Sequence, residues 1–398
     1  LVNFMIEARD ASGHSRLYPR LAPERTLLFV VDDRIQSTVS RYRLLVNAKN
    51  LNTPVTGLAR RLLHSDELVR GTFIFEESEV YYDIGLRYRG SPWNRPPEPK
   101  MFRLRFNGDK PFTDGVKRIN ISRYGSVQNE GTAYQLLLKA GTESTPVPYS
   151  PRYTYVNMKL NFTPHGSGAL SEIRPVDGDY MSFNWPSDSD GPAWKVTGKL
   201  AFTDGGQKTD SSPDWTQLKT YTTGPYPGEA SPENYRYYFN PTVDNDEDAF
   251  APLIGLLRVM DKATTPDAEY DEKIEEILNI DSSLRVFAVR SFLSDWDTVD
   301  IGNGQNAYLY YAPIEGRHYL VPWDMDHTFE RTDVAVGPPG GTNGFRRLIN
   351  RPIYKRQYAR ILKELSEGSW SEKYVSSWMN LVIETGAGGR VSPGTSLL

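Results

Sequence analysis

Residues 306–311 read Asn-Ala-Tyr-Leu-Tyr-Tyr, and residues 318–326 read His-Tyr-Leu-Val-Pro-Trp-Asp-Met-Asp. Both stretches are rich in aromatic and branched aliphatic residues, and residues 314–316 between them end in a glycine, so the pair predicts a β-hairpin. A helical pattern ends just before it, at residues 294–297, Ser-Asp-Trp-Asp. Because a hairpin returns the chain towards its starting point, we expect the polar residues at its two ends to converge.

Helical periodicity dominates the last third of the chain. Residues 250–262, 270–278 and 282–295 carry apolar residues at a spacing near 3.6, and Asp281 is a suitable N-cap for the third segment. Two further helices are predicted, near residues 345–365 and 371–383.

The first two-thirds of the chain predicts mainly strands and loops, with one helix over residues 131–140. We therefore predict an α+β fold with a β-rich N-terminal lobe, residues 1–174, and a mainly helical C-terminal lobe, residues 175–398. Residues 175–248 are rich in Asp, Ser, Gly, Pro, Trp and Tyr, which indicates a loop-rich insert anchored by aromatic side chains. The tryptophans of this insert are Trp185, Trp194 and Trp215.

The composition excludes several classes of protein. The 398 residues include no cysteine, which rules out disulfides, thiolate zinc sites and a cysteine nucleophile. With 46 basic and 50 acidic residues the net charge is −4, so we expect no nucleic-acid partner. No apolar run approaches the roughly 20 residues of a membrane-spanning helix. The sequence begins with Leu1 rather than Met, so we expect a processed or trimmed N-terminus.

The densest polar cluster lies at the two ends of the hairpin. It contains four aspartates and an asparagine without a balancing Lys or Arg in the same segments: Asp295, Asp297, Asn306, Asp324 and Asp326. Such a cluster is stable if it binds a divalent cation, and oxygen ligands of this kind suit Mg²⁺ or Ca²⁺. The alternative is a set of exposed loop carboxylates that cap the neighbouring helix and strands, and spacing alone leaves both interpretations open.

Five motifs in the chain together resemble the CotH (spore coat protein H) kinase family. In order they read Arg-Tyr-Arg-Gly (87–90), Pro-Lys-Met-Phe-Arg (99–103), Asp-Trp-Asp (295–297), Asn-Ala-Tyr-Leu-Tyr (306–310) and Val-Pro-Trp-Asp-Met-Asp (321–326). The resemblance implies a two-lobed, atypical protein-kinase-like fold with a metal-site hairpin. It also implies an enzyme that uses ATP with Mg²⁺, or Mn²⁺, to phosphorylate Ser or Thr of a protein substrate.

The resemblance assigns roles to the residues of the acidic cluster. Asp297 matches the catalytic aspartate that accepts the proton of the substrate hydroxyl, although Asp295 lies close enough in sequence to compete for this role. Asn306 and Asp324 match the metal ligands, and Asp326 is a second carboxylate ligand or a neighbour that supports one.

Three further residues are implied at the nucleotide. Lys100 and Arg89 lie on predicted strands of the N-terminal lobe, where cations that bind phosphate belong, and Glu172 falls where the family chain crosses between the lobes, near the base. Each has a structural alternative: a solvated lysine, an ion-pair partner for the arginine, and a loop cap for the glutamate. The family also implies a secreted protein or one at the cell or spore surface.

Two other functions compete with the kinase hypothesis. Asp324 to Thr328 fits the Asp-x-Asp-x-Thr motif of haloacid-dehalogenase-type phosphatases, although that fold requires parallel βα units after the motif. A non-catalytic, pseudokinase-like surface or coat protein that binds partners through residues 175–238 is the other alternative. The chain departs from the family pattern in a proline-rich stretch at residues 91–97 and at Glu330.

Overall fold

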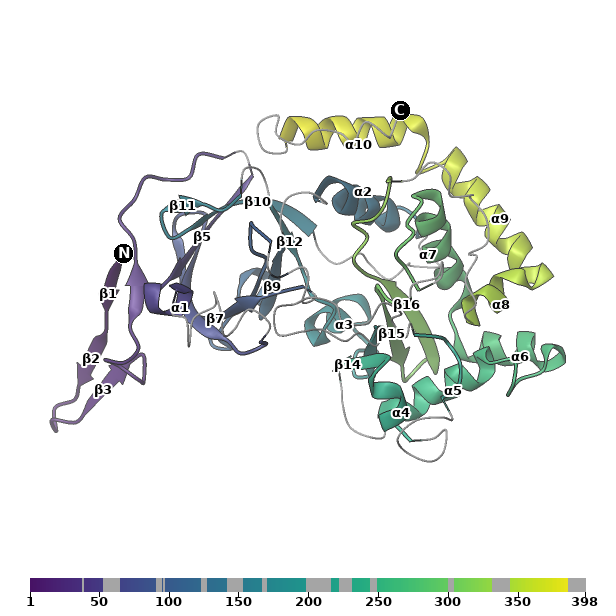
Figure 1. Ribbon diagram of the computed structural model, residues 1–398, viewed down its shortest axis with the longest axis horizontal. Helices are drawn as coiled ribbons and strands as arrows, with labels where there is room; N and C mark the ends of the chain where they lie inside the picture. Colours follow the sequence, from purple (N-terminus) through teal and green to yellow (C-terminus); the bar gives the residue numbers. More distant parts are fainter. Residues whose placement is uncertain are drawn as a thin grey trace.

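The structure is a computed structural model in which a β-barrel adjoins a mainly helical part (Figure 1). It describes residues 1–37, 39–52, 65–90, 95, 97–122, 127–141, 153–166, 170–197, 216–221, 231–243, 249–299, 304–330 and 344–385. The mixture of sheets and helices confirms the predicted α+β class. None of the described helices combines the length and the hydropathy that crossing a bilayer requires.

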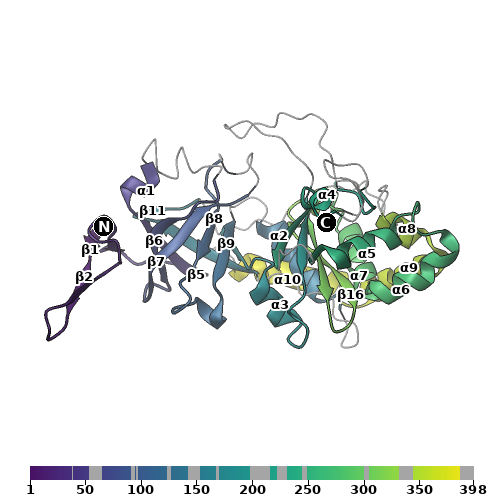
Figure 2. The ribbon, with the colours of Figure 1, turned by 90° about the horizontal axis from the view of Figure 1, so that it is seen from below.

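The N-terminal half is built from strands. They are β1 (Val2–Phe4), β2 (Ile6–Arg9), β3 (Ser15–Tyr18), β4 (Leu27–Phe29), β5 (Ser40–Val46), β6 (Val69–Phe75), β7 (Glu79–Tyr88), β8 (Phe102–Arg105), β9 (Arg118–Ser122), β10 (Tyr153–Leu160), β11 (Thr163–Pro164) and β12 (Leu170–Ile173). Two short helices, α1 (Ala48–Asn52) and the 3₁₀ turn η1 (Thr113–Gly115), join them. The β2–β3 hairpin projects from the barrel at the end far from the helical part (Figures 1 and 2).

Eight of these strands form one sheet in the order β11-β10-β12-β9-β8-β7-β6-β5. Because β10 also pairs in parallel with β5, every strand of this sheet except β11 belongs to a closed barrel. The interior is filled by buried aromatic and aliphatic side chains, Phe73, Phe102 and Leu104 among them. The N-terminal part is therefore β-rich as predicted, but its closed barrel is not part of the two-lobed kinase fold that the resemblance implies.

The C-terminal half combines a small sheet with helices. Its strands are β13 (Ala193–Val196), β14 (Phe239–Val243), β15 (Ala307–Ala312) and β16 (Arg317–Pro322), in the order β14-β13-β15-β16. Its helices are α3 (Gly178–Asn184), α4 (Glu233–Arg236), α5 (Phe250–Met260), α6 (Asp267–Ile277), α7 (Ile280–Phe292), α8 (Gly344–Asn350), α9 (Pro352–Glu367) and α10 (Glu372–Thr385). The β15–β16 hairpin is the one predicted from the sequence.

One helix from the N-terminal half belongs to the second core. Helix α2 (Val127–Leu138) lies between the barrel and α7 in both views (Figures 1 and 2). Its Ala133, Leu136 and Leu137 are fully buried in the same apolar cluster as Phe287 of α7. The division between lobes predicted at residues 174 and 175 stays a prediction. Helix α2 precedes this division in sequence but packs against α7, which follows it.

Two details of the predicted helices were wrong. Asn279, not Asp281, caps α7, because its side chain accepts a hydrogen bond from the backbone N–H of Ser282. The segment predicted as one helix over residues 345–365 is broken into α8 and α9, because Pro352 begins a new helix at its first position. Trp185 and Trp194 of the predicted insert are buried, while Trp215 lies outside the described residues.

Candidate functional site

Asp297 and Asn306 lie side by side where the chain enters the hairpin. The Asn306 amide nitrogen Nδ2 donates to carboxylate oxygen Oδ2 of Asp297 at 3.0 Å and to its backbone carbonyl at 2.7 Å. Nε2 of Gln305 donates to the other carboxylate oxygen at 2.7 Å. These bonds orient the Asp297 carboxylate. Because Nδ2 of Asn306 is turned towards Asp297, the amide oxygen of Asn306 is turned the other way, as a metal ligand would be.

Arg290 on α7 holds the two ends of the hairpin together. Its Nη2 donates to the backbone carbonyls of Asn306 at 2.6 Å and Trp323 at 3.0 Å. Its Nη1 lies 3.3 Å from Oδ2 of Asp295, and both side chains are inaccessible to solvent. Asp295 is therefore a buried ion-pair partner, and Asp297 is the aspartate of this motif that lies beside the Asn306 amide.

Asp324 and Asp326 follow strand β16 at the other end of the hairpin. Asp324 adopts a left-handed backbone conformation with φ of 55°, and its backbone N–H donates to the Tyr134 hydroxyl at 3.2 Å. Burial, together with the charge of Asp324, raises the pKa of Asp326 to about 7. Burial also raises the pKa of Glu130 on α2, and both aspartates add to this effect. Carboxylates that raise one another's pKa repel as anions, and a cation bound beside them would relieve this repulsion.

Two basic side chains interact electrostatically with these carboxylates, Lys195 with Asp324 and Arg89 with Glu130, and Arg103 lies near both cations. Lys195 on β13 pairs across the sheet with Tyr308 of β15. Burial lowers the pKa of the Lys195 ammonium, and the opposing influence of Asp324 shows that this carboxylate lies near it. Arg89 and Arg103 lie near the same ammonium and lower its pKa further. The Arg103 Nε is buried without a hydrogen-bond partner among the described residues, so this guanidinium has a free donor.

Sequence reasoning identified Arg89 but missed Arg103, Lys195 and Glu130. Arg103 belongs to one of the quoted motifs and alternates with buried Phe102 and Leu104, a pattern that places it on the outer face of the barrel. Lys195 lies between two fully buried residues of a short strand, inside the segment predicted to be loop-rich. Glu130 gave no signal, because its importance follows only from the position of α2.

The structure places Glu172 apart from this cluster. In the barrel wall Glu172 pairs with Ile121, whose side chain is inside, whereas Arg89 donates to Ser122, the next residue along β9. Neighbouring side chains point to opposite faces of a strand, so Glu172 points into the barrel and Arg89 points out. Inside, Glu172 accepts a hydrogen bond from the Tyr42 hydroxyl and lies 2.6 Å from Nε of Arg174.

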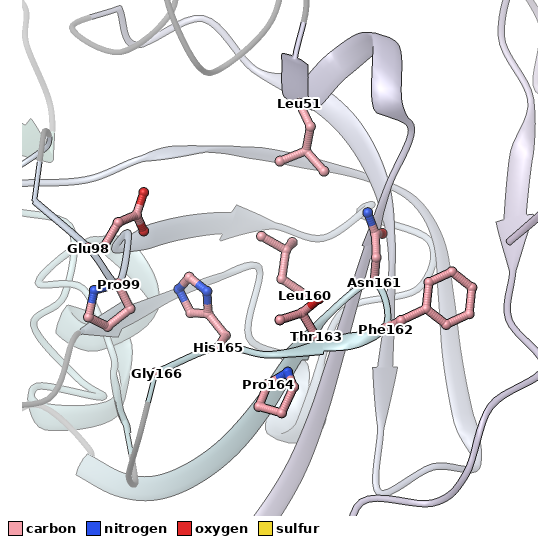
Figure 3. A pocket seen from close by; sticks show the side chains of 10 residues that line it. All are labelled: Leu51, Glu98, Pro99, Leu160, Asn161, Phe162, Thr163, Pro164, His165 and Gly166. Carbon is pink, nitrogen blue, oxygen red and sulfur yellow. The ribbon is translucent and has the colours of Figure 1, made fainter.

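Two hollows mark the two ends of the barrel. Glu172 and Arg174 line one of about 340 Å³, beside the start of β5. The other, of about 510 Å³, lies where β10 ends and is lined by Glu98 and His165 (Figure 3). Lys100 belongs to this second end, since its ammonium lies 3.2 Å from Glu98 Oε1. Glu172 therefore points into the barrel, and Lys100 forms an ion pair with Glu98.

The donors of the acidic cluster suit Mg²⁺ bound together with a phosphate group. Among the described residues no three Asp, Glu or His side chains gather closely enough to hold a metal ion alone. Asp324, Asp326 and the Asn306 amide oxygen are hard oxygen donors, and Mg²⁺ usually takes one or two carboxylates and completes its shell with water and substrate phosphates. The residues present fit such a shared site.

The comparison with protein families agrees with this geometry. The family model described as CotH kinase protein matches residues 148–385. The chain belongs to the CotH kinase family. The match includes Asp297, Asn306, Asp324, Asp326 and Glu172, whereas the motifs that carry Arg89 and Lys100 precede it. A comparison with curated proteins gives no match.

The alternatives to a CotH kinase fare differently. After Asp324 the described residues form the helices α8, α9 and α10 and no strand, so the βα units that a haloacid-dehalogenase-type phosphatase needs do not follow the motif. Of the family departures, Glu330 lies at the rim of the cluster, where its Oε2 accepts a hydrogen bond from Trp296 at 3.1 Å and lies 3.0 Å from Nδ1 of His327. The proline-rich departure lies mostly outside the described residues.

Proposed function

We propose that this protein is an ATP-dependent phosphotransferase that requires Mg²⁺ or Mn²⁺ and phosphorylates Ser or Thr of a protein substrate. The observations that carry the proposal are the contact of Asp297 with Asn306 at one end of the hairpin and the charge interaction of Asp324 with Lys195 at the other end. Arg290 joins these two ends. Phosphoryl transfer depends mainly on positioning and on neutralising phosphate charge, so carboxylates for the metal and cations for the phosphates are the groups it needs.

Each group in the cluster has a place in this reaction. Asp297 accepts the proton of the substrate hydroxyl as its oxygen bonds to the γ-phosphorus and the bond from that phosphorus to the leaving oxygen of ADP breaks. Asn306, Asp324 and Asp326 would hold the metal, which would supply positive charge to neutralise the phosphates. These assignments rest on matching residues to the family pattern and on the donor chemistry of the cluster.

The phosphates would be bound by Arg89, Arg103 and Lys195. Arginine forms paired hydrogen bonds with phosphate oxygens, and a partly buried lysine supplies a point charge in a place of low dielectric constant. Lys100 and Glu172 remain predictions from the resemblance. If Glu172 contacts the base, the base must enter the barrel-end pocket, where Tyr42, Phe75 and Phe112 offer aromatic walls.

A γ-phosphate transfer assay with Mg²⁺ or Mn²⁺ tests the proposal. We expect the wild type to label itself or a Ser-rich peptide, and Asp297→Asn to bind ATP normally but transfer about 100-fold more slowly. Asp324→Ala should lose metal-dependent nucleotide binding. Asp109→Asn, at an exposed turn of the barrel, is the control and should behave as the wild type.

The alternative functions predict other results. A pseudokinase-like surface or coat protein would bind partners without transferring phosphate in any of these variants. Wild-type protein that neither transfers phosphate nor shows a nucleotide-induced rise in melting temperature would exclude the enzyme. The family also suggests a secreted protein or one at the cell or spore surface.

A further inference from the structure

Helix α2 connects the barrel to the loop that carries Asp324. Towards the barrel, α2 approaches β10 so closely that a Cβ on Gly131 would lie 2.8 Å from Cε1 of Tyr153 and 2.8 Å from the Tyr155 hydroxyl. Any larger residue here would push these two tyrosine side chains aside. Towards the second core, its apolar face packs against α7. The helix is therefore held on two sides, and two of its polar side chains, Asn129 and Tyr134, bind the loop.

Two side chains of α2 bind that loop. The Tyr134 hydroxyl accepts a hydrogen bond from the backbone N–H of Asp324 at 3.2 Å and donates to Oε1 of Glu130 at 3.1 Å. Nδ2 of Asn129 donates to the backbone carbonyl of Thr328 at 2.9 Å. Tyr134 and Glu130 are 1% and 3% exposed, so water cannot readily replace these bonds.

The Asp324 backbone needs such support. Its φ of 55° is unfavourable for a residue with a Cβ and persists where the surroundings hold it. A buried backbone N–H requires a hydrogen-bond acceptor, and the Tyr134 hydroxyl accepts the bond from the Asp324 N–H. The direction of the Asp324 carboxylate follows from this backbone conformation. Glu130 in turn accepts a hydrogen bond from the Tyr134 hydroxyl, so a lone pair of the hydroxyl oxygen points to the Asp324 N–H.

We propose that Tyr134 is a positioning residue for the metal site, which acts by fixing the backbone of Asp324, and that Asn129 supports the same loop at Thr328. This inference rests on the proposed function, because it gives Asp324 the role of metal ligand. Tyr134 itself does not touch the metal or the nucleotide. Its effect is confined to the concentration of metal that the site requires.

The test compares Tyr134→Phe with Tyr354→Phe. The control tyrosine is 2% exposed on α9 and donates to Glu275 at 2.9 Å, so each variant loses one buried hydroxyl. Mn²⁺ binding is measured by electron paramagnetic resonance with a non-hydrolysable ATP analogue. We expect Tyr134→Phe to need about tenfold more Mn²⁺ for half-saturation, and Tyr354→Phe to match the wild type. Asn129→Ala should shift the same midpoint in the same direction.

The reaction supplies a second readout. The slow transfer by Tyr134→Phe should recover at high metal concentration, since the variant retains every ligand, whereas general destabilisation would not be rescued in this way. Equal metal midpoints in Tyr134→Phe and the wild type would overturn the inference and leave the proposed function intact. A wild type that binds no Mn²⁺ with the nucleotide analogue would overturn both.

Discussion

The buried Arg290 is the residue on which the geometry of the acidic cluster most depends, and Arg290→Lys tests this. Lysine keeps the positive charge beside Asp295 but cannot reach two carbonyls with a planar fork. The variant loses one or both bonds to the Asn306 and Trp323 carbonyls. Hydrogen bonds from a charged donor contribute about 1.5–3 kcal/mol each, so we expect the free energy of unfolding to fall by about 1.5–6 kcal/mol.

Arg285→Lys is the matched control on the same helix. Arg285 is also nearly buried, and it donates to the Ala140 carbonyl at 2.8 Å and to Asp281 at 2.9 Å, away from the hairpin. Urea unfolding followed by tryptophan fluorescence should show comparable losses of stability in both variants. Only Arg290→Lys should also lose metal-dependent nucleotide binding, because only Arg290 joins the two ends of the hairpin.

The ion pair with Asp295 gives a second test of the same reasoning. Arg290→Met leaves a buried carboxylate without its partner and should cost about 3–5 kcal/mol. Adding Asp295→Leu removes that charge, so the double variant should be more stable than Arg290→Met alone. Normal nucleotide binding by Arg290→Lys, or a double variant no more stable than the single one, would refute the role given to Arg290.

Two further predictions concern other residues. Lys195→Met should weaken ATP binding about tenfold or more in titrations with a fluorescent nucleotide, because the Lys195 ammonium interacts with the charge of Asp324, and the exposed Lys110→Met is the control. Burial lowers the pKa of His318 from 6.5 to about 4, so the unfolded chain binds the proton more tightly. Stability should therefore fall by about 3 kcal/mol as pH drops from 6.5 to 4, and His318→Gln, measured by urea unfolding, should lose less.

The parts of the fold with a local signal could be predicted from the sequence. The hairpin over residues 306–321 has two short apolar runs and a glycine-containing turn, which fix its register without help from the rest of the chain. Helix α7 could be predicted because its apolar residues recur at a spacing near 3.6. Since these elements are adjacent in sequence, the approach of Asp297 to Asn306 also follows from local geometry, and the structure confirms this contact.

The parts that depend on distant contacts could not be predicted. The barrel closes through parallel pairing of β5 with β10, in which Ser40 lies opposite Val156, and no local pattern announces a partner so far along the chain. Closure of the barrel also decides which residues of the motif at 99–103 lie on its outer face. Arg103 lies on the outer face of the barrel, while the ammonium of Lys100 lies 5.7 Å from the ring of Tyr88, which belongs to the barrel core. The motif alone does not show which of its residues lie inside the barrel, so it could not distinguish Arg103 from Lys100 as the residue on the outer face.

The apolar interior of the barrel explains why Arg89 and Arg103 lie on its outer face. Phe73, Phe102 and Phe106 occupy the inside, so a charged guanidinium on β7 or β8 is stable only on the outer face. Part of that face lies near β13, since Arg89 and Arg103 affect the Lys195 ammonium. The apolar core therefore keeps these cations on the outer face of the barrel. The outer face of a closed barrel can thus carry the cations that bind phosphate in the proposed reaction, even though the barrel differs from the N-terminal lobe of a two-lobed kinase-like fold.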